Sequence, residues 1–105
     1  MIRRFAVLTL LLMAAACAHA QETSAPVAEG RRVFQDQGCY GCHTVGVTGT
    51  PIGPDLSHIG GKRTRSYLIG WLRDPSSHKP TARMPKLTLT DAEVQSLAAF
   101  LSSLR

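Results

Sequence analysis

The pentapeptide Cys39-Tyr40-Gly41-Cys42-His43 decides how this chain is interpreted. Two cysteines separated by two residues lie about one helical turn apart, so both thiols can face one edge of a flat ring. Each thiol can add to a vinyl group of a porphyrin, and the histidine that follows can bind the metal from one face. Cys-x-x-Cys followed by His is the spacing of c-type haem attachment. We therefore predict one covalently bound haem c, anchored by Cys39 and Cys42, with His43 as an iron ligand.

Two other chemistries could use the same residues. A thioredoxin-like dithiol requires a βαβ setting around the motif, and the sequence shows none. A structural zinc site requires four ligands. The nominal ligands are Cys39, Cys42, His43, His58 and His78. They include no second tight pair, so zinc is the weaker interpretation.

The first twenty residues have the three parts of a secretory signal peptide. Two arginines precede an apolar run at residues 5–16, and Ala18-His19-Ala20 is an A-x-A cleavage site. We expect residues 1–20 to be removed, which leaves a single domain at residues 21–105 in the periplasm. Cys17 keeps an alternative open, because a lipid on this cysteine would tether the chain to a membrane.

Three segments have the apolar periodicity of helices. They are residues 26–37, 65–73 and 91–103. Thr64 can cap the second helix, and Thr90 begins a capping box ahead of the third. The stretches between the helices, including Gly60-Gly61 and residues 76–89, are predicted loops, and no strand is expected. The sequence therefore predicts an all-α domain with three main helices and long loops.

The first and third predicted helices carry matching faces. Gly30 and Phe34 lie one turn apart on the first helix, and Leu97 and Phe100 lie on the apolar side of the third. A glycine inside a helix costs up to about 1 kcal/mol relative to alanine, so Gly30 is expected to allow a close approach. We predict that these two helices cross at Gly30 and Phe34.

Met84 is the candidate for the second axial position on the iron. It is the only methionine of residues 21–105, and Pro85 follows it in the loop. A thioether is a soft, neutral ligand that suits haem iron opposite a histidine. The alternatives are a methionine that fills a gap in the core and ligation by His58 or His78 instead.

Four further residues are candidate haem contacts. The carbonyl of Pro54 could accept the second ring N–H of His43 and fix its tautomer, although a plain turn would also explain this proline. Trp71 is either a core residue or a donor to a haem propionate. Tyr67 borders the same helical face, and Arg63 is a candidate partner for a propionate.

The formal net charge is +5 for the full chain, and it falls to +3, a mild value, without the two arginines of residues 1–20. No basic patch is interleaved with aromatic residues, so nucleic-acid binding is unsupported. Seven basic residues lie between the haem motif and the C-terminal segment: Lys62, Arg63, Arg65, Arg73, Lys79, Arg83 and Lys86. A solvated surface would explain them. A basic rim that pairs with the propionates and steers docking onto an acidic redox partner would also explain them.

Taken in order, these motifs resemble the class I c-type cytochromes. The stretch from Tyr67 to Pro75, followed by Met84-Pro85, is similar to the cytochrome c domains fused to some bacterial oxidase subunits, although no copper-site or transmembrane region accompanies it. The resemblance implies a cytochrome c fold around one haem, with axial ligands His43 and Met84. It also implies that the Pro54 carbonyl orients the ring of His43.

The expected function is periplasmic electron transfer, in which the haem carries one electron between a donor and an acceptor protein. On this interpretation the chain is not itself an enzyme. A second hypothesis makes it the haem c subunit of a larger periplasmic or membrane oxidoreductase. A third, a haem enzyme or gas sensor with an open iron, requires that Met84 is not a ligand.

Overall fold

The computed structural model describes residues 25–105, so the predicted signal peptide and Cys17 lie outside the described residues. The first helix of the described residues occupies residues 25–36. The remaining elements are η1 (Cys39–Gly41), β1 (Thr44–Val45), β2 (Thr48–Gly49), α2 (Ile59–Lys62), α3 (Arg65–Arg73), α4 (Pro75–His78) and α5 (Asp91–Ser103). The domain is mostly helical, as the sequence predicts.

Helices α3 and α5 each begin just after a threonine cap. Thr64 Oγ1 accepts a hydrogen bond of 3.2 Å from the backbone N–H of Tyr67. Thr90 Oγ1 accepts one of 3.1 Å from Glu93 N–H and contacts the Glu93 carboxylate. These bonds satisfy donors that the first turn of a helix otherwise leaves without partners. The predicted boundaries of both helices are confirmed.

The hydrophobic core lies where α5 meets the helix of residues 25–36 and α3. Its buried members are Val33, Phe34, Leu68, Leu72, Val94, Leu97, Ala98, Phe100 and Leu101. The predicted crossing is confirmed, since the rings of Phe34 and Phe100 meet edge to face at 5.4 Å. A Cβ on Gly30 would overlap the carbonyl oxygen of Ser96 and lie 2.7 Å from Phe100 Cβ. Only glycine allows this approach.

Three local predictions were wrong. Gly60-Gly61 lies in the short helix α2, because Gly60 packs on the end of α5 and its N–H donates to Leu104 O at 2.7 Å. The predicted loop at residues 76–89 is irregular only after His78, because Pro75 follows the end of α3 and opens α4 as a first-turn proline. A two-stranded antiparallel hairpin pairs Thr44 with Gly49.

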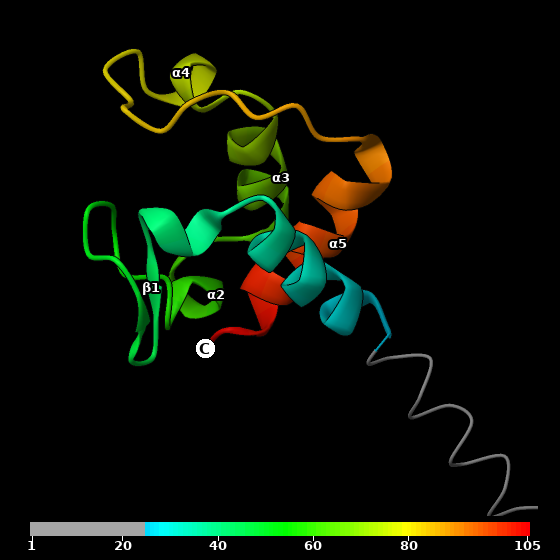
Figure 1. The fold of residues 1–105 in the computed structure, drawn as a ribbon. Helices are drawn as coiled ribbons and strands as arrows, with labels where there is room; N and C mark the ends of the chain where they lie inside the picture. The colour runs from blue at the N-terminus through cyan, green and yellow to red at the C-terminus, as the bar shows by residue number, and fades with distance from the viewer. Residues whose placement is uncertain (1–24) are drawn as a thin grey trace, which may run out of the picture.

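Figure 1 shows how these elements frame the site. Helix α5 lies between the N-terminal helix and α3, the hairpin and α2 lie to one side, and α4 and the loop after it run across the top. The chain ends beside α2. None of the helices in residues 25–105 combines the length and apolar character needed to span a bilayer.

Candidate haem site

The two cysteines of the motif lie on and just after η1. Gly38 enters this turn with a φ of 72°, which favours glycine, and His43 N–H closes it on Cys39 O at 2.9 Å. Cys39 is half-buried and Cys42 is exposed. Burial raises the pKa of the Cys39 thiol. The attacking thiol of a catalytic dithiol has a lowered pKa, so Cys39 does not have the environment of such a thiol.

The ring of His43 is held by the loop that follows the hairpin. Its Nδ1 lies 2.8 Å from the carbonyl oxygen of Pro54, which has no donor of its own. A carbonyl oxygen can only accept, so Nδ1 carries the proton and the lone pair is at Nε2. That tautomer leaves Nε2 free to bind a metal.

Gly53 is a site residue whose role the sequence did not indicate. A Cβ at this position would lie 2.8 Å from Cε1 of His43 and 3.1 Å from Nδ1. The backbone of Gly53 is itself tied to the motif, since its N–H donates to Cys42 O at 2.6 Å. Absence of a side chain therefore lets this loop lie directly against the imidazole.

Asp55 anchors the same loop to the hairpin. Its Oδ1 accepts hydrogen bonds from Ser57 Oγ at 2.7 Å, from Ser57 N at 3.1 Å and from Thr44 Oγ1 at 3.0 Å. Ser57 Oγ in turn accepts from Gly46 N–H at 2.8 Å. The two bonds from Ser57, followed by that from Thr44, lower the pKa of Asp55. This network fixes Asp55, the residue that follows the Pro54 carbonyl.

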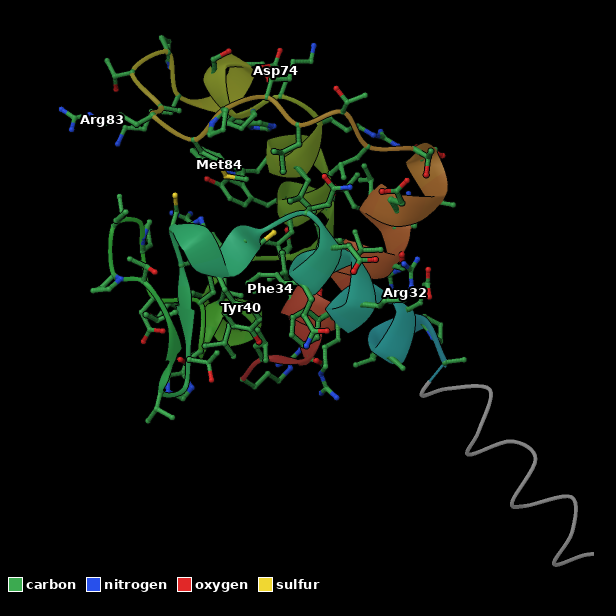
Figure 2. The ribbon with its side chains drawn as sticks, in the orientation of Figure 1. Arg32, Phe34, Tyr40, Asp74, Arg83 and Met84 are labelled. Carbon is green, nitrogen blue, oxygen red and sulfur yellow. The ribbon has the colours of Figure 1, made fainter. Side chains whose placement is uncertain are left out.

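Met84 comes from the loop after α4. Figure 2 shows Arg83 projecting outward from this loop while Met84 turns back toward the body of the domain. Met84 is half-buried and packs against the core cluster. Its Sδ lies 3.1 Å from Nε1 of Trp71 and accepts the indole N–H. The structure thus gives Trp71 a thioether as its partner, where the sequence left a core residue and a propionate donor open.

The remaining predicted contacts gather around Trp71. Tyr67 stacks on Trp71 with ring centroids 6.2 Å apart and an interplanar angle of 20°. The guanidinium of Arg63 lies 4.6 Å from the centre of the Tyr67 ring. Within residues 25–105 Arg63 forms no ion pair, which leaves its charge available to an anion.

His58 and His78, the two alternatives to Met84 as an iron ligand, lie in different parts of the domain. His58 Nδ1 lies 3.1 Å from the carbonyl oxygen of Arg105. His78 lies against Tyr67 and Trp71, at centroid distances of 5.6 and 6.4 Å. Across residues 25–105 no three His, Cys, Asp or Glu side chains come together as a metal-ion site. The donor set is therefore unsuited to structural zinc, and an imidazole with a free Nε2 beside two thiols suits a haem.

Comparison with known proteins agrees with this geometry. The family model described as cytochrome c matches residues 27–105. Cytochrome c oxidase subunit 2 of Alkalihalophilus pseudofirmus is 35% identical over 86 residues, which cover 73% of this chain and 25% of that protein. The C subunit of nitric oxide reductase from Stutzerimonas stutzeri is 29% identical, and the match covers 76% of this chain and 59% of that protein.

The same nitric oxide reductase component from Halomonas halodenitrificans is 30% identical over 71% of this chain and 56% of that protein. The chain thus spans a quarter of the oxidase protein and somewhat over half of each reductase protein. With the family match over residues 27–105, this chain belongs to the cytochrome c family.

Proposed function

We propose that this chain is a periplasmic one-electron carrier with His43 and Met84 as the axial ligands of its haem. The observation that carries the proposal is the 2.8 Å contact between His43 Nδ1 and Pro54 O, which leaves Nε2 as the metal-binding nitrogen. Met84 supports it as the one methionine of residues 21–105, turned inward from its loop. When bound, haem c supplies a reversible one-electron couple at its iron.

The protein's own residues would bind the haem, orient its ligands and keep water from it. Cys39 and Cys42 hold its edge, and the Pro54 carbonyl keeps the imidazole of His43 in one tautomer. Trp71 and Tyr67 line the methionine side, and Arg63 offers a positive charge to a propionate. With both axial positions filled by protein, no small-molecule site remains at the metal, which favours electron transfer over catalysis.

Five of the seven residues of the predicted basic rim, Lys62, Arg63, Lys79, Arg83 and Lys86, support docking on an acidic partner. All five side chains are exposed, and none of them is in an ion pair within residues 25–105. Arg73 and Arg65 are set apart, since Arg73 pairs with Asp91 and Arg65 donates to Gln95 O. Such a rim speeds the encounter with an acidic partner at low salt. The rate of electron transfer to that partner should therefore fall as the salt concentration rises.

The ligand assignment is tested by Met84→Leu, which keeps the volume and removes the sulfur. The ferric wild-type protein should show the weak far-red absorption of an Fe–S(Met) bond, and the variant should lose it while keeping both thioether links. His58→Ala and His78→Ala are the matched controls for the rival ligands and should both keep the band. A band that survives in Met84→Leu would refute the assignment.

A second candidate function is that of a haem c subunit in a larger oxidoreductase. The relatives named as subunits of cytochrome c oxidase and nitric oxide reductase favour it. Such a component should remain bound to its partner during purification at moderate salt, whereas a free carrier should leave it. Mass spectrometry of the exported protein tests the location at the same time, since it reports cleavage after Ala20 or a lipid on Cys17.

A further inference from the structure

The carbonyl that contacts His43 belongs to a residue that cannot anchor its own backbone. Pro54 has no N–H, so its main chain donates no hydrogen bond. On one side Gly53 is tied to the cysteine motif, since its N–H donates to Cys42 O at 2.6 Å. The position of the carbonyl therefore depends also on what holds the residue on the other side, which is Asp55.

Asp55 connects the residue after this carbonyl to the residue after the proposed iron ligand. Its Oδ1 accepts the hydroxyl of Thr44 at 3.0 Å, and Thr44 directly follows His43. The backbone joins the same two segments, because Leu56 N–H donates to Thr44 O at 2.9 Å. Thr44 thus meets the loop through both its side chain and its main chain, and it holds His43 beside that loop.

The carboxylate of Asp55 is itself held in one orientation by Ser57. Asp55 Oδ1 accepts from Ser57 Oγ at 2.7 Å and from Ser57 N–H at 3.1 Å. Ser57 Oγ also accepts the N–H of Gly46 at 2.8 Å, which brings the turn of the hairpin into the network. A single carboxylate oxygen therefore has three donors, and hydrogen bonds to a charged group are stronger than those between neutral groups.

The main chain of His43 is also held by the end of the hairpin. Thr50 N–H donates to His43 O at 3.2 Å, and a Cβ on Gly49 would overlap the same carbonyl oxygen. The hairpin therefore packs closely on His43, while Asp55 acts on the next residue through Thr44. The direction of the imidazole toward its acceptor depends on both contacts.

We propose that Asp55 is a positioning residue for His43, which keeps the Pro54 carbonyl opposite the imidazole through the bond to Thr44. This inference rests on the proposed ligation by His43. A hydrogen bond donated by Nδ1 makes the imidazole a stronger donor at Nε2, and a stronger donor favours ferric iron. Loosening of the contact should therefore raise the reduction potential and let the Nδ1 proton exchange faster with solvent.

The test is Thr44→Val in the haem-loaded protein, because valine keeps the shape of threonine and removes the hydroxyl that bonds to Asp55. Loss of one hydrogen bond to a charged group corresponds to about a tenfold change in the opening of the contact. Exchange of the His43 Nδ1 proton, followed by NMR, should be about tenfold faster, and the potential should rise. Thr48→Val is the matched control, since Thr48 lies in the same hairpin and its hydroxyl makes no hydrogen bond within residues 25–105.

Asp55→Asn and Asp55→Ala separate positioning from general destabilisation. Asparagine keeps Oδ1 as an acceptor, so exchange should stay near the wild-type rate, whereas alanine removes the acceptor and should speed exchange at least as much as Thr44→Val. Equal exchange rates in the two Asp55 variants would overturn the proposal, because the retained acceptor would then have no effect. A Thr44→Val protein that is less stable but unchanged in exchange and potential would overturn it too, since the bond would then serve the fold alone.

The exchange measurement follows His43 and is independent of Met84. Faster exchange in Thr44→Val together with an absent far-red ferric band would refute ligation by Met84 and still support the role of Asp55. A wild-type protein whose His43 ring shows no paramagnetic shift in the ferric state would refute ligation by His43 and this inference together.

Discussion

Replacement of Gly53 by alanine should disturb His43, the proposed axial ligand, from a position that carries no ligand atom. The added Cβ would lie 2.8 Å from Cε1 of His43, 3.1 Å from Nδ1 and 3.2 Å from Cys42 O. Carbon atoms in comfortable contact are about 3.5–4.0 Å apart, so a displacement of roughly 0.7 Å is required. The loop cannot easily yield, because Gly53 N–H is bonded to Cys42 O at 2.6 Å.

The ring of His43 is therefore expected to move. A shift of roughly 0.7 Å away from Pro54 would lengthen the 2.8 Å bond to its carbonyl beyond the usual N–H···O range of about 2.7–3.2 Å. Overpacking of this kind costs about 1–3 kcal/mol. The expected result is a loss of that size in the free energy of unfolding, together with release of the His43–iron bond at a higher pH during acid titration.

Gly61→Ala is the matched control. Gly61 lies in α2 and a Cβ there would meet no atom within 4 Å, so alanine should be neutral or stabilise the helix by up to about 1 kcal/mol. Denaturant unfolding followed by circular dichroism gives the free energy, and the visible spectrum during acid titration follows the ligand. Identical unfolding and identical ligand release in Gly53→Ala and Gly61→Ala would refute the steric argument.

Three further substitutions test other parts of the fold. Gly30→Ala should lower the free energy of unfolding by about 1–3 kcal/mol, because its Cβ would overlap Ser96 O at the helix crossing; an unchanged denaturation midpoint would contradict this. Thr90→Ala should cost about 1 kcal/mol by removing the cap of α5, and Thr88→Ala, three residues before the helix, is its control in the same unfolding assay. Asp55 has a lowered folded pKa, so its contribution is present above its unfolded pKa of about 3.9 and is lost as pH falls through the folded value. Asp55→Asn should therefore flatten the loss of stability below about pH 4, and equal acid slopes for the two proteins would disprove the assignment.

Helices α3 and α5 could be predicted to the residue because their boundary signals are local. Thr64 and Thr90 lie one residue before each helix, and a cap acts on the first turn alone. The apolar spacing of α5 also indicates that it packs against the helix of residues 25–36, since Leu97 and Phe100 need a facing surface and Gly30 leaves room for one. Local chemistry therefore predicted both the helices and the crossing between them.

One missed element, α2, depends on a distant part of the chain. Gly60-Gly61 has low helix propensity, and α2 forms there because Gly60 packs on α5 and bonds to Leu104 O. The other missed element, the hairpin, is local, and Gly46 and Gly49 adopt φ values of 60° and 109° in it. The glycines between β-branched residues were a usable signal for a tight hairpin, although strands of two residues are too short for alternation to be visible.

In the candidate site too, some contacts could be predicted from local chemistry and others could not. The approach of the Pro54 carbonyl to His43 followed from chemistry, since a metal-binding imidazole needs an acceptor and proline offers a carbonyl without a donor. The bond from Trp71 to Met84 did not follow, because it depends on where an irregular loop crosses α3. The role of Gly53 was likewise invisible until the ring and the loop were placed together.

The core and the site are built from different parts of the chain, and this separation bears on function. Every buried member of the core cluster comes from a helix, whereas His43 and Met84 come from loops and are only half-buried. Loops without a regular backbone ladder open at a lower free energy than core helices. The stability of the fold is thus set mainly by the helices, while the geometry around the proposed haem iron would be set by a few directional bonds, from His43 to the Pro54 carbonyl and from Trp71 to Met84. Changes to those bonds can alter the redox properties while the helical core stays intact.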